Sequence, residues 1–412
     1  MLSEKEKLET LTRLGIDLNQ VQDLDLLMER ILTEARRFVN ADAGSIYIRS
    51  RNQLHFSYTQ NDTLQQRLCP GEKLIYSTFS IPVDKKSIAG YAAATGELLN
   101  LPDVYRIDPA LPYGFSDRFD RASHYHTGSM LTIPLKNSKG DVLGVLQILN
   151  AQNESGMIVP FSPENEKIMM LFASIASVAL ERAQMTRDMI LRTIRMAEMR
   201  DPKETGAHVN RVGGYAVELY EKWAYRHGYS RQEVDSNRDI LRMAAMLHDV
   251  GKVGISDTIL KKPARFTPEE YEIMKQHTVL GSKLFEGSRS DFDEAAADVA
   301  LNHHERWDGK GYPGYVDPFT GKAIPEYAGE DGKPRGKKGE EIPIFGRIVA
   351  LADVFDALSS ARVYKEAWTE DRVLETIRND SGSHFDPELV EIFFSSLDIM
   401  RSIQQRYADG DA

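Results

Sequence analysis

Two mostly apolar helical segments in the second half of the chain lead directly into ionisable side chains, which limits how the chain can fold. Residues 241–247 are followed by His248 and Asp249, and residues 348–352 are followed by Asp353. A carboxylate among apolar neighbours is costly to bury unless it meets a cation or hydrogen-bond donors. We therefore predict a helical region in which these side chains converge on a shared cation.

Other candidate ligands are scattered over the same region. A single histidine on a helix is usually an ordinary core or surface group, but here five of the ten histidines occur in such clusters. The candidate ligands are Glu204, His208, His248, Asp249, His277, His303, His304 and Asp353. Imidazole and carboxylate without thiolate suit iron or manganese, with zinc as an alternative. Eight ligands exceed what one ion needs, so we predict two or three divalent metal ions.

The first half of the chain alternates between helical and strand-like patterns. Residues 8–40 have helical periodicity in two pieces, whereas 43–48 and 53–58 read as strands. Residues 132–150 contain two apolar runs around the turn at 137–141, which is typical of a β-hairpin. This order predicts an α+β domain built on an antiparallel sheet.

A long helical segment is predicted over residues 162–200, with Ser162 as its N-cap. Its apolar positions at 168, 171, 172, 175, 178 and 179 are three or four residues apart, and Met185, Met189 and Ile194 extend the stripe. We expect the first half of the helix to pack on its own sheet. The second half is expected to pair with a second copy, which predicts a homodimer.

Composition narrows the possible partners and compartment. The net charge of -11 argues against a general nucleic-acid binder, so DNA is not an expected partner. Cys69 is the only cysteine, which excludes a disulfide within the chain and fits a reducing compartment. The N-terminus lacks an apolar signal core, and no run of about 18 apolar residues occurs. We expect a cytoplasmic protein without a membrane span.

The first half also resembles a GAF domain. The resemblance is carried by residues 87–97, by 101–104 and by the hairpin at 131–150. GAF domains bind small ligands or mediate dimers. Members that bind cyclic nucleotides have a Lys after the Asn at the end of this hairpin and an Asp-Glu pair further on, whereas this chain has Ala151 and Asn165 at the positions of the Lys and the Asp. An unknown small ligand, or none, is therefore expected in place of a cyclic nucleotide.

The second half resembles the HD-GYP branch of the HD phosphohydrolases. The matching motifs are at residues 200–206, 248–252, 303–313, 353–358 and 362–365. The resemblance implies hydrolysis of cyclic di-GMP to pGpG, and in some members on to GMP, at a centre of two or three metal ions, iron or manganese. A Glu at the position of Glu204 is typical of trinuclear members, so three ions are favoured.

The same resemblance assigns roles to individual residues. Asp249 is the expected bridging carboxylate and, with Lys252, the expected catalytic residue. Lys252, Arg362 and Lys365 are expected to contact the substrate phosphates. Tyr312 is expected to bind substrate by stacking on guanine, as is Trp307, although packing within their loop is an equal alternative for both.

The patterns and the two resemblances together predict the domain organisation. We expect an α+β GAF domain (antiparallel sheet with flanking helices) at residues 1–185 and an all-α HD-type domain at 200–412, joined by the long helix at 162–200. The GAF domain is expected to regulate the second domain through this helix.

The sequence leaves two alternatives for the function open and differs from the family pattern at one insertion. The centre could bind a cyclic dinucleotide without cutting it, although such receptors usually lack some of these ligands. The substrate could instead be cyclic GMP-AMP, because guanine and adenine differ only at exocyclic groups. An insertion at residues 317–341, rich in Gly, Lys and Glu, departs from the family pattern and is expected to be a solvated, mobile loop, with a substrate lid as the alternative.

Overall fold

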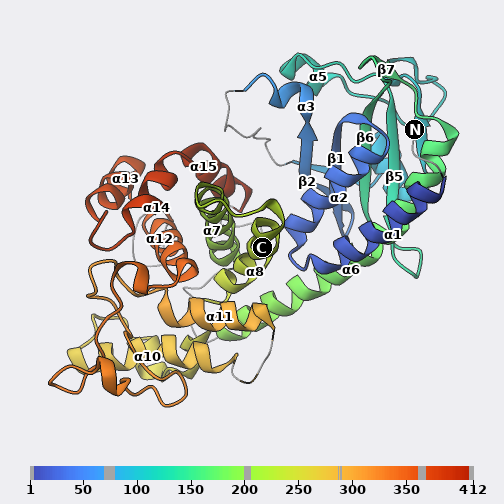
Figure 1. The fold of residues 1–412 in the computed structure, drawn as a ribbon. Helices are drawn as coiled ribbons and strands as arrows, with labels where there is room; N and C mark the ends of the chain where they lie inside the picture. Colours follow the sequence, from blue (N-terminus) through green and yellow to red (C-terminus); the bar gives the residue numbers. More distant parts are fainter. Residues whose placement is uncertain are drawn as a thin grey trace. The chain divides into compact units, whose positions relative to one another are not determined.

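The structure is a computed structural model that describes residues 4–68, 79–198, 206–285, 287, 290–360 and 368–407, with no side chains described at 4–10 and 197–198. Four residues singled out by the sequence, Cys69, Glu204, Arg362 and Lys365, lie outside the described residues. The chain divides into two compact units, Met1–Arg187 and Asp188–Ala412 (Figure 1).

The N-terminal unit is built on a seven-stranded antiparallel sheet with the strand order β3-β2-β1-β6-β5-β4, and β7 pairs with β6. The predicted hairpin is confirmed, because β5 and β6 pair from Met130↔Leu149 to Lys136↔Val142. The strands are β1 (Ala41–Ser50), β2 (Gln53–Asn61), β3 (Ser80–Pro82), β4 (Leu99–Leu101), β5 (Met130–Lys136), β6 (Val142–Gln152) and β7 (Ile158–Val159).

Helices cover both faces of this sheet (Figure 1). Alternation along the strands sends Ile46 and Leu146 to one face, where α1, α2 and α6 pack, and sends Tyr47 and Val145 to the other face, where α4 packs. The helices are α1 (Glu4–Gln20), α2 (Leu24–Phe38), α3 (Asp62–Gln65), α4 (Ile88–Thr95), η1 (Val104–Arg106), α5 (Arg118–Ser123) and α6 (Pro163–Glu198). The predicted α+β class is confirmed.

Helix α6 differs in detail from the predicted stripe. Phe172 and Ala179 are buried against the sheet as expected, but Leu171 and Val178 are exposed. The sheet-facing positions are instead completed by small or flexible side chains, namely Met169, Ala173, Ala176 and Ala183. Ile194, predicted to extend the stripe towards a second copy, is buried in the C-terminal unit with Val209 and Met246. The helix therefore carries apolar residues on more than one face.

One helix in the described part of the chain, α6 over Pro163–Met196, is long and apolar enough to cross a membrane by length and composition alone. Only 44% of its most apolar window is buried, because residues such as Leu171, Val178 and Met185 face outwards. Its buried face packs on the sheet of the N-terminal unit, and a core helix of this kind meets the same criteria.

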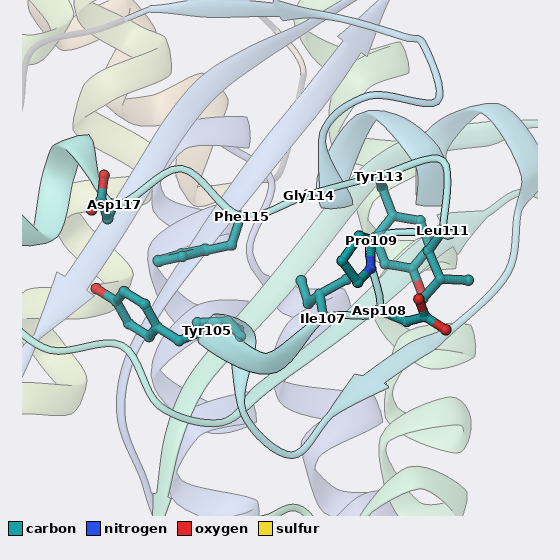
Figure 2. A pocket seen from close by; sticks show the side chains of 10 residues that line it. Tyr105, Ile107, Asp108, Pro109, Leu111, Tyr113, Gly114, Phe115 and Asp117 are labelled. Atoms are coloured by element: carbon teal, nitrogen blue, oxygen red, sulfur yellow. The ribbon is translucent and has the colours of Figure 1, made fainter.

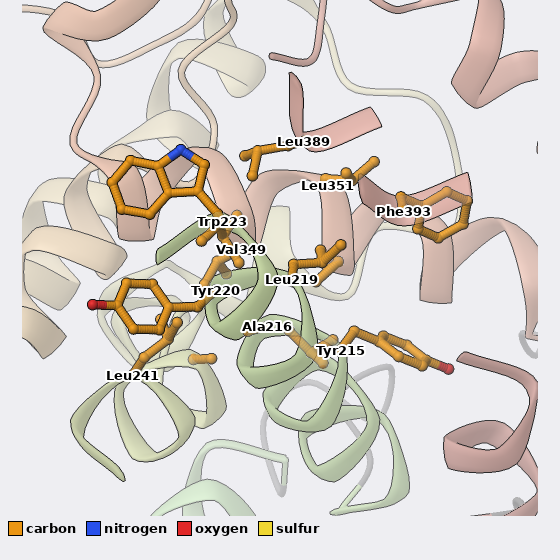
Figure 3. Close-up of a cluster of buried hydrophobic side chains, with 14 of the residues drawn as sticks. Tyr215, Ala216, Leu219, Tyr220, Trp223, Leu241, Val349, Leu351, Leu389 and Phe393 are labelled. Carbon is orange, nitrogen blue, oxygen red and sulfur yellow. The ribbon is translucent and has the colours of Figure 1, made fainter. Parts of the chain in front are cut away.

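The regular structure described in the C-terminal unit is helical, as predicted. Figure 3 shows side chains of α7, α8, α12 and α14 in its core, among them Tyr220, Leu241, Leu351 and Phe393. The helices are α7 (Gly206–Arg226), α8 (Arg231–Met246), η2 (Val250–Gly254), α9 (Asp257–Leu260), α10 (Pro268–Lys283), α11 (Asp291–Asn302), η3 (Pro325–Tyr327), η4 (Gly339–Glu341), α12 (Ile344–Ser359), α13 (Glu370–Asn379), α14 (Pro387–Phe394) and α15 (Leu397–Arg406).

The insertion after Tyr312 has hydrogen-bonded structure of its own. The amide of Tyr315 donates to Arg335 O at 2.9 Å, and the rings of Tyr315 and Tyr327 stack 3.9 Å apart. Gly321 lies against Val279 of α10. Most residues of the insertion are at least partly exposed, so it is solvated as predicted. It is nevertheless folded and contacts α10 of the helical core.

A pocket of about 500 Å³ lies in the N-terminal unit, along the segment that follows η1. Figure 2 shows the rings of Tyr105 and Phe115 close together beside it, with centroids 5.2 Å apart. The lining residues are Val104, Tyr105, Ile107, Asp108, Pro109, Leu111, Tyr113, Gly114, Phe115 and Asp117.

Candidate metal centre

Five elements bring the predicted ligands together. His208 lies on α7, His277 on α10 and Asp353 on α12. His248 and Asp249 follow the end of α8, and His303 and His304 follow the end of α11. A Cβ at Gly251 would lie 1.9 Å from His277 O, so only glycine lets η2 come this close to α10. The glycine in the motif at residues 248–252 therefore allows η2 to pack against α10, which brings Asp249 close to His277.

Four of the predicted ligands form one group: Asp249, His277, His303 and His304. Each offers one ligand atom, and these atoms all lie within 4.8 Å of one another. Asp249 Oδ1 is 3.1 Å from His277 Nε2 and 3.6 Å from His303 Nε2. Oδ1 is buried and accepts no hydrogen bond from any described residue.

Three others, His208, His248 and Asp353, form a second group that meets the same 4.8 Å limit. Asp353 Oδ1 is 3.6 Å from His208 Nε2 and 3.9 Å from His248 Nε2. Asp249 connects the two groups, because its other oxygen, Oδ2, is 3.3 Å from His248 Nε2. The same Oδ2 accepts a hydrogen bond from Lys252 Nζ at 2.6 Å.

Backbone carbonyls fix the tautomer of three of these histidines. His248 Nδ1 lies 2.8 Å from Ala245 O and His277 Nδ1 lies 2.7 Å from Met274 O, while His303 Nδ1 lies 3.1 Å from two carbonyls of α11. A carbonyl only accepts, so each Nδ1 must carry a proton, and in a neutral ring Nε2 keeps its lone pair. His277 Nε2 and His303 Nε2 then face each other at 3.5 Å.

Electrostatics favour the neutral form of two histidines, His303 and His304, and the charged form of Asp249. Burial lowers the pKa of His303 and holds the pKa of His304 well below its usual range. Burial opposes ionisation of Asp249, but the Lys252 ammonium 2.6 Å away is the largest opposing influence, and the pKa of Asp249 is held well below the usual range. Imidazole nitrogens that converge on an ionised carboxylate are suited to a cation.

His208 is oriented by a carboxylate that the sequence reading passed over. Asp356 Oδ2 lies 2.8 Å from His208 Nδ1, and the Arg211 guanidinium donates to both oxygens of Asp356 at 2.6 and 2.9 Å. Tyr215 completes the cluster at 3.2 Å. Burial opposes ionisation of Asp356, but the bonds from His208 and Arg211 prevail and lower its pKa to about 2. The available signal was a second aspartate one helical turn after Asp353.

Burial differs across the centre. The side chains of His248 and His303 are fully buried, whereas 16% of the Asp353 side chain and 18% of the Lys252 side chain are exposed. His304 is also partly exposed. Solvent therefore reaches the centre at these three residues.

The two aromatic candidates lie in different surroundings. The Tyr312 ring stacks on His304 with centroids 4.8 Å apart, which places it beside the first ligand group. Trp307 packs against the Arg347 guanidinium and Gly339, and its amide donates to His384 O. Trp307 therefore contacts α12 and the insertion, while Tyr312 lies beside candidate ligands; stacking of either ring on guanine stays a prediction.

Comparison with protein families gives two matches. Residues 23–180 match the GAF domain, and residues 205–358 match the HD domain. Over 230 residues the chain is 39% identical to a cyclic di-GMP phosphodiesterase of Vibrio cholerae, an alignment that covers 54% of this chain and 42% of that protein. Over 216 residues it is 38% identical to a cyclic di-GMP phosphodiesterase of Thermotoga maritima, covering 52% and 50%.

A third relative carries a different name. Over 207 residues the chain is 37% identical to 3'3'-cGAMP-specific phosphodiesterase 2 of Vibrio cholerae, an alignment that covers 50% of this chain and 34% of that protein. The chain thus spans half or less of the length of these three relatives. With the α+β sheet domain and the helical domain that contains the candidate centre, these matches show that the chain contains a GAF domain at residues 23–180 and an HD domain at residues 205–358.

Proposed function

We propose that this chain is a metal-dependent phosphodiesterase that hydrolyses a cyclic dinucleotide, with cyclic di-GMP as the first candidate. The observation that carries the proposal is the 3.5 Å approach of His277 Nε2 to His303 Nε2 beside Asp249, while a backbone carbonyl lies within hydrogen-bond distance of Nδ1 in each ring. Relatives named cyclic di-GMP phosphodiesterase align with about half of this chain. They support the proposed substrate.

The donor set fits divalent metal ions, iron or manganese in preference to zinc. Asp249, His277, His303 and His304 would hold one ion, and His208, His248 and Asp353 a second. Glu204 remains the proposed contributor to a third. When bound, such ions lower the pKa of coordinated water and neutralise charge on phosphoryl oxygens.

The residues of the chain itself supply positioning and charge. Lys252 holds its ammonium 2.6 Å from Asp249, so a phosphate at the centre would lie within reach of a positive side chain. Asp356 keeps the Nδ1 proton of His208 in place and thus directs Nε2 towards the centre. Arg362 and Lys365 remain proposed phosphate contacts from outside the described residues.

The test is hydrolysis by protein loaded anaerobically with iron or manganese. We expect cyclic di-GMP to be converted to pGpG, with GMP as a possible second product, and a chelator to abolish turnover until metal is restored. His303→Ala should lose both metal and activity. Binding of cyclic di-GMP without turnover in iron, manganese, zinc and nickel would instead favour a receptor without catalysis.

Cyclic GMP-AMP is a second candidate substrate, because one relative is named as specific for it. The two dinucleotides should be compared by kcat/KM on the same metal-loaded preparation. A preference of at least about tenfold, equivalent to 1.4 kcal/mol, would assign the substrate.

The remaining proposals concern the GAF domain and assembly. We propose that it regulates hydrolysis through α6, that the pocket lined by Tyr105 and Phe115 is where a small ligand would bind, and that the protein is a cytoplasmic homodimer. If GAF regulation is wrong, a truncation beginning near Met185 will have unchanged activity and unchanged response to cell-derived ligands.

A further inference from the structure

An aromatic and cationic cluster adjoins the candidate metal centre on α10. Tyr271 and Lys275 lie one helical turn apart, and Lys275 Nζ is 4.8 Å from the centroid of the Tyr271 ring. The same ammonium is 5.5 Å from the centroid of Tyr312, and the two tyrosine rings lie edge to face at 6.2 Å. We call Tyr271, Lys275 and Tyr312 the α10 platform.

The α10 platform is continuous with the candidate ligands. Tyr312 stacks on His304 at 4.8 Å and meets the His277 ring edge to face at 6.4 Å. His277 is two residues after Lys275 on the same helix. A molecule held at the partly exposed side of the centre, beside His304, therefore has Tyr312 as its neighbour and Tyr271 and Lys275 next along the surface.

The outer members of the platform remain accessible. Tyr271 is 45% exposed, and 26% of the Lys275 side chain is exposed. Lys275 also pairs with Glu272 at 2.7 Å, an exposed pair three residues apart on one helix. Exposed pairs of this kind contribute little to stability, so exchanging Glu272 for a phosphate would cost the fold little. A partly exposed aromatic ring with an ammonium over one face matches the chemistry of a nucleotide, which offers a base to stack on the other face and a phosphate to pair with the ammonium.

We propose that Tyr271 and Lys275 bind the half of a cyclic dinucleotide that is not held at the metal centre. Tyr271 stacks on its purine, and Lys275 pairs with its phosphate. The substrate has two phosphates and two purines, and among the described residues the candidate centre with Lys252 accounts for only one phosphate and for neither purine. Arg362 and Lys365, outside the described residues, are proposed phosphate contacts and leave the second purine without a partner. This inference rests on the proposed function and extends it by naming residues that determine affinity for the second nucleotide.

The experiment measures KM and kcat for cyclic di-GMP with the manganese-loaded full chain. Stacking of a base on an aromatic side chain contributes about 1–3 kcal/mol, so Tyr271→Ala should raise KM about tenfold. Lys275→Met should raise KM by a similar factor, whereas Tyr271→Phe and Lys275→Arg, which keep the ring and the charge, should stay within about twofold of wild type. The kcat of these variants should stay close to the wild-type value, because neither residue contacts the candidate ligands directly.

Matched controls separate this role from a general effect on the surface. Tyr225→Ala removes a tyrosine of similar exposure, 49%, from α7, and Lys261→Met removes a lysine that pairs with Asp257 within α9 and its cap. Both should leave KM unchanged. Metal content and tryptophan fluorescence should match wild type in all variants.

The outcomes distinguish this inference from the proposed function. An active wild type whose KM is unaffected by Tyr271→Ala and Lys275→Met overturns the inference and leaves the proposed function standing. A KM that rises equally in Tyr271→Phe also overturns it, because the stacking ring is still present. A wild type that neither binds nor hydrolyses any cyclic dinucleotide overturns both.

Discussion

At the scale of single residues, the candidate centre depends on groups that orient its ligands as much as on the ligands. Asp356 is 1% exposed and interacts with His208, Arg211 and Tyr215. Partners of this kind fix the tautomer and direction of a ligating histidine. Asp356 therefore has two roles: its hydrogen bonds hold α12 against α7, and it orients His208 for metal binding at the proposed centre.

Asp356→Asn should lower both stability and metal content. The substitution removes the carboxylate that pairs with the buried Arg211 guanidinium, and breaking a buried pair of this type costs about 3–5 kcal/mol. Metal affinity should fall about 10–100-fold because His208 loses its orienting carboxylate. Metal analysis and denaturation followed by tryptophan fluorescence measure the two effects. Asp398→Asn, an exposed aspartate paired with Arg401, is the control, and equal behaviour of the two variants would contradict the role of Asp356.

Asp298 gives the C-terminal unit a pH-dependent stability. Burial raises its pKa from 3.8 to about 6, against the opposing influence of Lys337 and the hydrogen bond from Asn302. Because the folded chain binds this proton more tightly than the unfolded chain, protonated Asp298 stabilises the fold, and this stabilisation is complete below about pH 4. It is lost as the pH rises through about 6.

Asp298→Asn should therefore be more stable than wild type at pH 8 by about 2–3 kcal/mol, a difference that disappears below pH 4. The amide oxygen still accepts from Asn302, so the substitution removes mainly the charge. Trp223, Trp307 and Trp368, the three tryptophans, all lie in the C-terminal unit, so their fluorescence reports on its unfolding. A difference that is independent of pH would show that Asp298 does not titrate in this way.

At the scale of elements, the insertion is fastened to the centre by one buried carboxylate. Glu305 accepts hydrogen bonds from the amide of Gly314 at 2.5 Å, just before the insertion, and from the amide of Lys337 at 3.2 Å, near its end. Lys337 Nζ donates to Asn302 Oδ1 at 2.5 Å. Since Asn302 and Glu305 flank His303 and His304, the insertion is tied to the segment that carries two candidate ligands.

Glu305→Ala should release the insertion. The change removes the acceptor of the buried Gly314 amide, at about 1–3 kcal/mol, and that of the partly buried Lys337 amide, at a smaller cost. We expect faster proteolytic cleavage within residues 315–341 and a smaller loss of metal than His303→Ala causes. Glu340→Ala, at an exposed glutamate near the end of the same insertion, should be cleaved at the wild-type rate. Unchanged cleavage in Glu305→Ala would show that the rest of the insertion holds it in place.

At the scale of the whole molecule, α6 supports the proposed homodimer. Leu171, Val178 and Met185 are seven residues apart on this helix and are 55%, 60% and 62% exposed. Apolar residues at a repeat of seven are characteristic of a helix that packs against a partner helix. A second copy of α6 presents the same stripe and is the occupant that we propose for it.

If the proposed dimer forms through this stripe, Val178→Glu combined with Met185→Glu should give a monomer, because four carboxylates would meet between the two copies. Sedimentation velocity measures the change. Met157→Glu places the same charge at an equally exposed methionine of the N-terminal unit, 62%, and should stay dimeric. A wild-type monomer at micromolar concentration, or a dimer that survives the double substitution, would reject this interface.

Features that depend on local order and on residue chemistry can be predicted from the sequence. Helical periodicity and the hairpin turn predicted both domain classes, the apolar runs pointed to His248, Asp249 and Asp353, and the clustered histidines added the other described candidate ligands. They act over a few residues, as in the bond from His277 Nδ1 to Met274 O. Tertiary structure alone decided which distant groups meet. Asp356 and His208 are 148 residues apart, and Tyr271 meets Tyr312 from another element. Such contacts are set by the packing of whole helices, which no local pattern in the chain encodes.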